Sequence, residues 1–426
     1  YYIHIIIWSV MKTFVKIVFV CVVYIYSISY VYAEDITVYK SLLPKRFMTV
    51  DKKQQLCTLY GTQDTPINYT CSSGQVDGDK EVEGDKKTPE GVYFITGSIL
   101  EGLDFEEYGS RAYPLNYPNP IDTIEQKTGY GIWVHGKGPS VFKKYGTRGC
   151  VAFNENDMLV VYPNFIVSYP VVIGETVTLK EDEPSSDYIR IKDAVYSWAR
   201  TWTEQQNDFF THYDGSKKAN FEHFVNNKRY FFNRFDFTFV DIDEPYIVRK
   251  GDYYVVWFRQ YYYAPNMVIE GIRYLYWQLG EDNVPRILVE EWKPDTSSTT
   301  KETLGERLES RVNEFLAEWK DSWEKGDVTK YSAMYTSNAS QGNIRGNKAI
   351  AKSKERIWKK NKPEKISIEN VQTKLTPKGI EVRFKQTYQA SGKYMDIGEK
   401  VLYIVPQSNS TSKWKITKET WRRLSK

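Results

Sequence analysis

A pattern that recurs within the second half of the chain limits the fold more than any other feature. Five apolar residues with the spacing of one helix face occur twice, with corresponding members 121 positions apart (312 − 191): Ile191, Ala194, Val195, Trp198 and Trp202, then Val312, Phe315, Leu316, Trp319 and Trp323. Further on, FRQYY at 258–262 corresponds to FKQTY at 384–388, an offset of 126 (384 − 258), and Trp292 corresponds to Trp421, an offset of 129 (421 − 292). An offset that drifts so little predicts a duplicated domain with small changes in loop length.

Each copy combines helix and strand patterns. The i, i+3, i+4, i+7 spacing predicts a long helix at the start of each copy. Apolar and aromatic residues alternate with charged or polar ones over 380–388, which predicts a half-buried strand. We place the first copy at 187–293, a Ser/Thr-rich linker at 294–304 and the second copy at 305–426. The sequence therefore predicts two tandem α+β domains.

The region before the copies has a different pattern. Short strands are predicted at 47–50, 55–60, 67–72, 91–96, 129–135 and 171–179, between turns rich in Gly, Asp and Pro. One helix is predicted at 155–162, with Asn154 as its N-cap. Residues 34–45 form a connector with helical potential, and 46–181 form a β-rich domain. A chain of 426 residues is long enough for these three domains.

Residues 1–33 resemble an export signal. Met11 is a plausible start, followed by Lys12 and Lys16, an apolar run, and small residues ending at Ala33. Cleavage after Ala33 is expected, with an uncleaved anchor helix as the alternative. In either case the body lies outside the cytoplasm, in the periplasm or cell envelope.

Export determines how the cysteines are interpreted. Cys57 and Cys71 lie on two predicted strands and are expected to face each other across a hairpin, where they are a candidate disulfide. This leaves Cys150 as the unpaired thiol.

The 58 basic and 54 acidic residues are nearly balanced. This balance argues against nucleic acid as a partner but allows weak attraction to an acidic polymer such as a cell wall.

The stretch 131–153, GIWVHGKGPSVFKKYGTRGCVAF, places His135 fifteen positions before Cys150 (150 − 135). A thiol nucleophile needs a base that removes its proton and donors that stabilise the oxyanion. We predict Cys150 as nucleophile and His135 as general acid/base, with Gly149 supplying a main-chain oxyanion donor. The carbonyl of Gly136 is predicted to orient the imidazole. The alternative is a buried thiol with an unrelated histidine.

Four segments in order carry a family resemblance: GDKEVEGDKKTPEGVYFI at 78–95, YPLNYPN at 113–119, GIWVHG at 131–136 and TRGCVAF at 147–153. Together they resemble the L,D-transpeptidases of the YkuD type, cysteine enzymes that act on the peptide stems of peptidoglycan. The resemblance covers about 46–181. Ala152 stands where many members have a basic residue, and Arg148 where others often have histidine, so substrate preference is left open.

The resemblance strengthens the assignment of Cys150 and His135. Substrate-binding candidates are Arg148, whose alternative is a solvated loop charge, and Trp133, whose alternative is a core position. Tyr117 and Asn119 complete this set. No cofactor or metal is predicted: Asp79 and Asp85 are expected to form turns, and His212 and His223 to be surface or core residues.

A helix packed on a curved antiparallel sheet, as predicted for both copies, resembles the ketosteroid-isomerase-like (nuclear transport factor 2-like) cone fold. Proteins with this layout include L,D-carboxypeptidases that shape helical cells. The resemblance implies a thioester on Cys150 that passes either to an amine, giving cross-links between third stem residues, or to water, trimming the terminal D-alanine. A non-enzymatic alternative is a wall-binding or scaffold protein that uses the two copies, with a homodimer or a wall protein as its partner.

Overall fold

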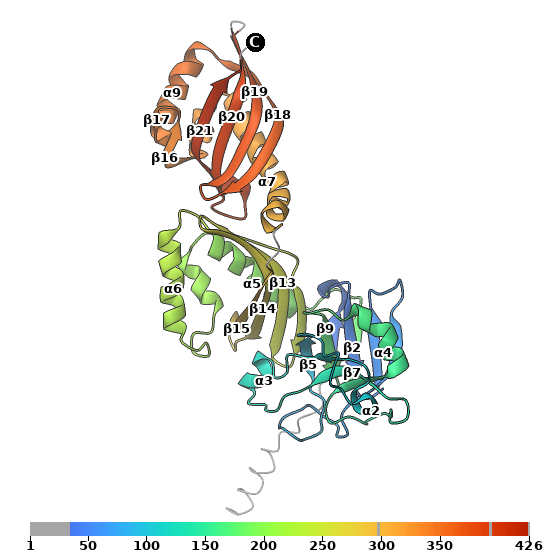
Figure 1. Cartoon of the computed structure of the whole chain (residues 1–426). Helices are drawn as coiled ribbons and strands as arrows, with labels where there is room; N and C mark the ends of the chain where they lie inside the picture. Colours follow the sequence, from blue (N-terminus) through green and yellow to red (C-terminus); the bar gives the residue numbers. More distant parts are fainter. Residues whose placement is uncertain (1–34, 296–298, 392–393, 425–426) are drawn as a thin grey trace, which may run out of the picture. The chain divides into compact units, whose positions relative to one another are not determined.

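The computed structural model describes residues 35–295, 299–391 and 394–424 (Figure 1). The predicted export signal at 1–33 lies outside these residues. The described chain forms two compact units. One holds residues 45–178 together with Asp35 and Ile36, and the other holds residues 37–44 and the chain from Leu179 onward. No helix within the described ranges is long and apolar enough to span a bilayer.

The first unit is built on an eight-stranded sheet with the order β5-β9-β2-β3-β4-β8-β7-β6. Its strands are β2 Phe47–Asp51, β3 Leu56–Tyr60, β4 Ile67–Ser72, β5 Gly91–Phe94, β6 Ala112–Pro114, β7 Trp133–Lys137, β8 Val151–Asn154 and β9 Pro170–Gly174. The helices are α2 Phe105–Tyr108, α3 Pro120–Ile124 and α4 Glu155–Val161, followed by the 3-10 turn η2 Tyr162–Asn164. Val134 and Val151, which pair across β7 and β8, are fully buried in its core.

Most of the predicted elements are confirmed here. α4 begins after Asn154, whose side chain accepts the N–H of Asn156 (3.0 Å) as the predicted cap. The strand predicted at 129–135 begins only at Trp133, because Gly129 and Gly131 have φ values of +102° and +72° that a strand does not allow. The strand predicted at 171–179 is divided into β9 and β10, Val177–Lys180.

The predicted connector at 34–45 is not purely helical. It contains strand β1, Ile36–Tyr39, which pairs with β10, and the 3-10 turn η1, Lys40–Leu42.

The second unit begins with an α+β domain that we call the first cone domain. It contains α5 Ser186–Thr203, η3 Asn207–His212, α6 Phe221–Arg234 and the strands β11 Phe239–Ile242, β12 Tyr246–Lys250, β13 Tyr253–Ala264, β14 Met267–Leu279 and β15 Pro285–Asp295. The strands form an antiparallel sheet in which β13 and β14 are the long central pair (Figure 1). Ile191, Val195, Trp198 and Trp202 of α5 are buried, so the predicted helix face is confirmed.

The second cone domain follows the same plan. It contains α7 Thr300–Glu324, α8 Val328–Ala333, β16 Tyr335–Gln341, β17 Ile344–Arg345, α9 Asn347–Lys360, β18 Pro363–Thr376, β19 Gly379–Ala390, β20 Tyr394–Val405, η5 Thr411–Lys413 and β21 Lys415–Arg423. The sheet order is β17-β16-β21-β20-β19-β18. The predicted α+β architecture is therefore confirmed. Strand β15 extends to Asp295 and α7 begins at Thr300, so the connection is shorter than the predicted 294–304.

Candidate active site

Two neighbouring parallel strands bring the predicted nucleophile and base together. In the β7–β8 ladder Val134 pairs with Val151 and His135 pairs with Ala152. Cys150 comes directly before β8, so it stands beside Trp133 in the same register. Side chains alternate between the two faces of a sheet. His135 and Cys150 therefore share one face as diagonal neighbours, a separation that an imidazole can reach across.

The imidazole of His135 is buried and held by its own main chain. It is only 2% exposed, and Nδ1 lies 2.5 Å from the Gly136 carbonyl oxygen. Nδ1–H donates to this carbonyl, which leaves Nε2 as the proton acceptor. Burial lowers the pKa of His135 to about 4. At neutral pH the residue is therefore an uncharged base, and the predicted orienting role of Gly136 agrees with this geometry.

The thiol of Cys150 is also uncharged at rest. Burial raises its pKa to about 11, although the Trp133 main-chain N–H and the charges of Arg148 and Lys137 act in the opposite direction. The Sγ–H lies 3.5 Å from the Gly131 carbonyl oxygen. Because both partners are neutral, attack by sulfur requires transfer of its proton to the imidazole as the new bond forms.

Gly149 shapes the turn that presents Cys150. Its φ is +132°, and a Cβ would lie 2.9 Å from the Lys87 carbonyl oxygen, so a larger residue does not fit. Its N–H donates to the Thr147 hydroxyl oxygen (3.1 Å), and that hydroxyl donates to the Cys150 carbonyl oxygen (2.7 Å). The Gly149 N–H is thus engaged within the turn, and the geometry does not support its predicted role as an oxyanion donor.

One aromatic residue beside the site was not predicted. Tyr108, at the end of α2, has its ring 5.3 Å from His135 and 5.4 Å from Trp133, measured between centroids. Helix α2 is also tied to β7 through Lys137, whose Nζ lies 3.1 Å from Glu107. A four-residue helix has no periodicity that would have identified Tyr108.

The predicted substrate-binding residues fall into two groups. Arg148 is exposed and Trp133 is half-buried against Tyr108. Tyr117 and Asn119 are only 6% and 4% exposed. The Asn119 side chain caps α3, and the Tyr117 hydroxyl donates to the Thr128 carbonyl oxygen (3.1 Å). These last two residues support the loop, and the geometry does not place them in a cleft.

The cysteine register differs from the prediction. Cys57 pairs with Tyr69 rather than with Cys71, so the partner of Cys57 lies two residues before the expected one. Both are buried free thiols. The two thiols are nevertheless close enough for a hydrogen bond between them, which together with burial raises the pKa of Cys57.

The aspartates of the GDK segments have the predicted structural role. Asp85 accepts main-chain N–H groups from its own turn and pairs with Lys80 (2.7 Å), and Asp79 pairs with Lys127 (2.6 Å). Among the residues that the structure describes, no three His, Cys, Asp or Glu side chains are placed to hold a metal ion.

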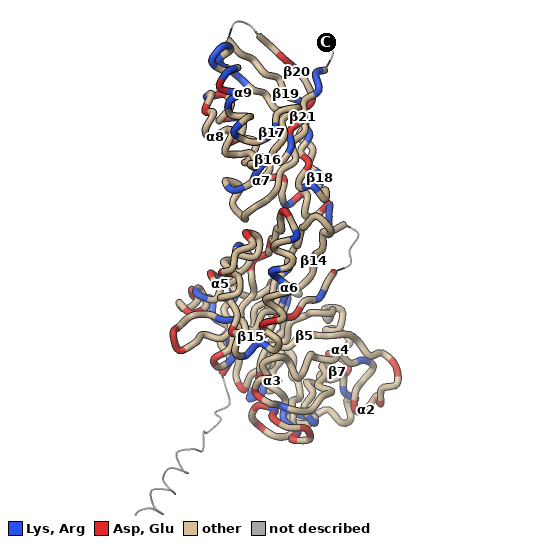
Figure 2. The backbone as a smooth tube through the Cα atoms, turned by 90° about the vertical axis from the view of Figure 1, so that its left-hand side faces the viewer, with Lys and Arg blue, Asp and Glu red and all other residues tan. Residues whose placement is uncertain are grey.

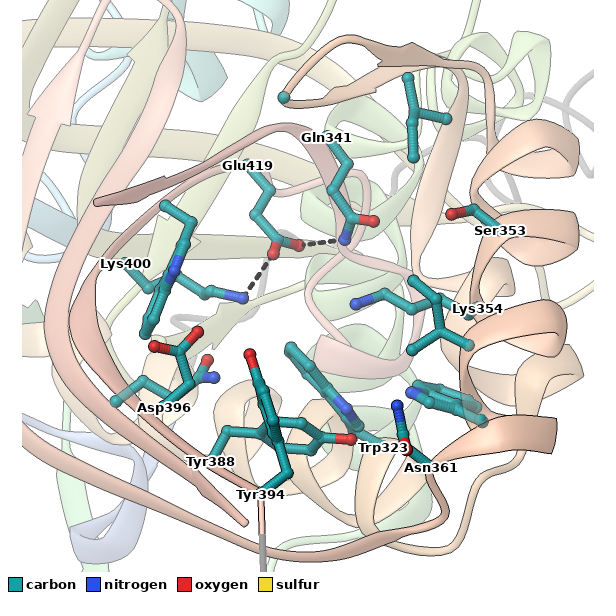
Figure 3. Close-up of a pocket in the computed structure, with 16 residues that line it drawn as sticks. Trp323, Gln341, Ser353, Lys354, Asn361, Tyr388, Tyr394, Asp396, Lys400 and Glu419 are labelled. Atoms are coloured by element: carbon teal, nitrogen blue, oxygen red, sulfur yellow. Dashed lines mark hydrogen bonds and ion pairs between the residues drawn. The ribbon is translucent and has the colours of Figure 1, made fainter. Parts of the chain in front are cut away.

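A second candidate site lies inside the second cone domain (Figure 3). It is a cavity of about 480 Å³, with Lys354 of α9 and Lys400 of β20 pointing into it. Glu419 pairs with Lys400 and accepts from Gln341 (2.8 Å). The remaining wall combines aromatic residues with polar ones: Trp323, Trp358, Tyr388, Tyr394 and Trp421, and Ser353, Asn361, Gln386 and Asp396.

Among the polar groups of this cavity, Lys354 and the Gln386 amide oxygen are incompletely satisfied. Lys354 Nζ lies 3.9 Å from the Trp323 ring centroid, and burial lowers its pKa to about 7. The Gln386 side-chain oxygen is buried and has no hydrogen-bond partner among the described residues. Buried polar groups are normally paired, so both are available to a ligand.

The first cone domain has a matching arrangement in which Arg273 takes the place of Lys400. Lys228 lies 3.6 Å from the Trp202 ring centroid, as Lys354 lies over Trp323. Arg273 donates through Nε to the Gln260 side-chain oxygen (3.0 Å) and covers the ring of Trp292 at 4.8 Å. The guanidinium of Arg273 thereby satisfies the amide that corresponds to Gln386 in the other domain.

Comparison with known proteins confirms the class of protein that this fold and site define. Residues 45–173 match the YkuD family, the L,D-transpeptidase catalytic domain, and residues 311–420 match the Cds6 C-terminal NTF2-like domain. The chain thus carries a cysteine-enzyme domain of the L,D-transpeptidase type, a family that acts on peptidoglycan peptides, and an NTF2-like domain that corresponds to the second cone domain.

Among solved structures, Bd1075 of Bdellovibrio bacteriovorus is similar, with 26% identity over 62% of this chain and 98% of that chain and a TM-score of 0.49. The helical cell shape determining protein Pgp2 of Campylobacter jejuni has 23% identity over 61% of this chain and 93% of that chain, with a TM-score of 0.44. No curated protein matches the chain.

Proposed function

We propose that the protein is a secreted cysteine acyltransferase that acts on peptidoglycan stem tetrapeptides and forms cross-links between third stem residues. The observation that carries this proposal is the β7–β8 register, which places a neutral His135 and the Cys150 thiol on one face of the sheet. The export pattern at 12–33 supports a location in the periplasm or envelope.

The reaction begins when Cys150 Sγ attacks the carbonyl carbon between the third residue and the terminal D-alanine. Its proton passes to His135 Nε2, and the Gly136 carbonyl stabilises the imidazolium through Nδ1–H. The imidazolium then protonates the leaving D-alanine nitrogen. The C–N bond breaks, and a thioester with the third residue remains on sulfur.

The second half of the reaction depends on the acceptor. An amine from a neighbouring stem gives a cross-link, whereas water gives a trimmed tripeptide, which is L,D-carboxypeptidase activity that sets cell shape. Ala152 pairs with His135 and is fully buried, so no basic side chain at this position reaches the acceptor. Arg148 is exposed beside the nucleophile and is the cation best placed to meet a substrate carboxylate.

The test is to incubate the protein with tetrapeptide muropeptides and analyse the products by mass. Dimers linked between third residues support the transpeptidase, and tripeptide without dimers supports the carboxypeptidase. Cys150→Ala abolishes both products, whereas Cys71→Ala, which changes a buried thiol, preserves them. Unchanged tetrapeptide with wild-type protein would overturn the enzymatic proposal.

A second candidate function is wall binding by the cone domains. The observation that favours it is the cavity with Lys354 and Lys400. Because Arg273 satisfies the Gln260 amide in the first cone domain, whereas the corresponding Gln386 oxygen has no partner among the described residues, we assign this binding to the second cone domain. Calorimetric titration of Cys150→Ala protein with muropeptides tests it: saturable binding that Lys400→Met weakens supports the assignment, and binding unchanged by Lys400→Met contradicts it.

A further inference from the structure

Helices α6 and α9 occupy matching places in the two cone domains and provide an internal comparison. Both are fourteen residues long, and they begin 126 positions apart (347 − 221). Their inward residues correspond: Ile350, Lys354 and Trp358 of α9 are buried, and the equivalent positions of α6 hold Phe224, Lys228 and Phe232, which are partly buried against the core.

The outward faces of the two helices are different. At four exposed positions α9 carries Lys348, Lys352, Arg356 and Lys359, where α6 carries Glu222, Asn226, Tyr230 and Asn233. The spacing i, i+4, i+8, i+11 puts the four cations on one side of the helix. We call these four residues the α9 cationic stripe. The internal face is thus similar in both domains, whereas the outer face is basic in only one.

The charge of the α9 cationic stripe is not neutralised. Within the described parts of the chain, none of its four side chains forms an ion pair with a carboxylate, whereas Lys325, directly after α7, pairs with Asp321 (2.8 Å). Glu355 is the acid beside the stripe. Figure 2 shows Lys and Arg positions along α9. Unpaired charges of one sign on a nearly balanced protein create a local positive potential.

The stripe borders a groove on the protein surface. The groove has a volume of about 570 Å³ and is lined by Ile344, Ala349, Lys352, Ser353, Glu355, Arg356 and Lys359. No aromatic residue is among these lining residues, so the groove offers no stacking platform for the bases of a nucleic acid.

The same helix does not present the pattern of a membrane-surface helix. Its exposed large apolar residue, Ile357, lies roughly 140° around the helix axis from Lys352. A helix that lies on a bilayer needs an exposed apolar stripe, and the apolar face of α9 is already packed inside the domain.

We infer that the groove along α9 binds a strand of acidic polysaccharide, in which carboxylates recur from sugar to sugar. Successive cations of the stripe are separated by about 4.5–6 Å along the helix axis, which is close to the length of one sugar unit. The chain thereby acquires an attachment site that is distinct from Cys150 and that adjoins the cavity around Lys400, since Ile344 and Ser353 line both. This inference does not depend on the proposed enzymatic activity.

The test measures binding of polygalacturonate to the purified protein by biolayer interferometry at 50 and 200 mM salt. The test variant replaces the stripe: Lys348→Gln, Lys352→Asn, Arg356→Gln and Lys359→Asn. The control variant removes the same charge from exposed lysines elsewhere: Lys180→Asn, Lys301→Asn, Lys374→Asn and Lys378→Asn. Both variants change the formal net charge from +4 to 0. Circular dichroism confirms that each is folded.

We expect the stripe variant to bind at least tenfold more weakly and with a shallower salt dependence, because fewer counterions are displaced, while the control variant stays within about twofold of wild type. Equal weakening in both variants would show attraction by net charge alone and overturn the inference. Tighter binding of polyphosphate, duplex DNA or phosphatidylglycerol vesicles than of polygalacturonate would also overturn it, because the ligand would then be of another class.

Discussion

The ionisation state of Cys150 yields the sharpest test of the site. The pKa of about 11 lies about 4 units above pH 7 (11 − 7), so only about 1 thiol in 10,000 is ionised at neutral pH, roughly 300-fold less than for a free cysteine. Alkylation by iodoacetamide requires the thiolate. We therefore expect the rate at Cys150 to rise about 100-fold between pH 7 and pH 9 without a plateau, as measured by mass spectrometry of its peptide.

Catalysis and alkylation should depend on pH in different ways. Since the pKa of His135 is about 4, the imidazole is uncharged above that pH, and turnover should persist to about pH 5 and fall below pH 4. His135→Asn should lower turnover by about 100- to 10,000-fold and leave the alkylation profile nearly unchanged. Cys57 and Cys71, which are fully buried, serve as internal controls. An alkylation rate that already reaches its plateau below pH 7 would refute the neutral pair and indicate a thiolate–imidazolium pair.

Three further predictions concern packing and buried groups. Gly136→Ala places a Cβ 2.1 Å from Glu155 Oε2, so thermal unfolding should show a loss of about 2–3 kcal/mol, and the added change Glu155→Ala should recover part of it. Burial lowers the pKa of Lys354 to about 7, so between about pH 7 and 10 the folded state binds fewer protons than the unfolded state, and the free energy of unfolding rises with pH. Lys354→Met should abolish this rise and stabilise the protein at pH 7 by about 1–4 kcal/mol. An undiminished rise for this variant in urea titrations would contradict the prediction. Cys57 and Cys71 should form a disulfide when the protein is refolded with oxidised glutathione, stabilising the domain by about 3 kcal/mol. A thiol titration of the denatured protein from residue 34 onward should then find one free thiol, and three would contradict the prediction.

Patterns in the sequence predicted those parts of the fold that depend on interactions between residues close together in the chain. The buried face of α5, centred on Trp198, follows from helix spacing alone, and the cap at Asn154 follows from local hydrogen-bond chemistry. The nucleophile and base were predicted from residue type and order. The strand pairing that holds them side by side was not, because β7 and β8 are joined across a loop and β8 itself is only four residues long.

The cavity of the second cone domain could not be predicted for a different reason. Lys354, Lys400 and Glu419 belong to a helix and two strands, and they meet only after the sheet has curved around them. In the sequence each resembles an ordinary surface charge. The opposite error was made for Tyr117 and Asn119, which were predicted to bind substrate. Both are buried and stabilise the loop that contains them.

The contrast between Arg273 and Lys400 has a consequence for chemical intervention. The Arg273 guanidinium donates to the Gln260 amide oxygen, whereas Lys400 pairs with Glu419 and the buried Gln386 oxygen has no hydrogen-bond partner among the described residues. A small molecule designed to accept from Lys354 and donate to Gln386 would therefore discriminate between two domains of the same architecture. Such a molecule would bind the second cone domain and not the first cone domain of the same chain.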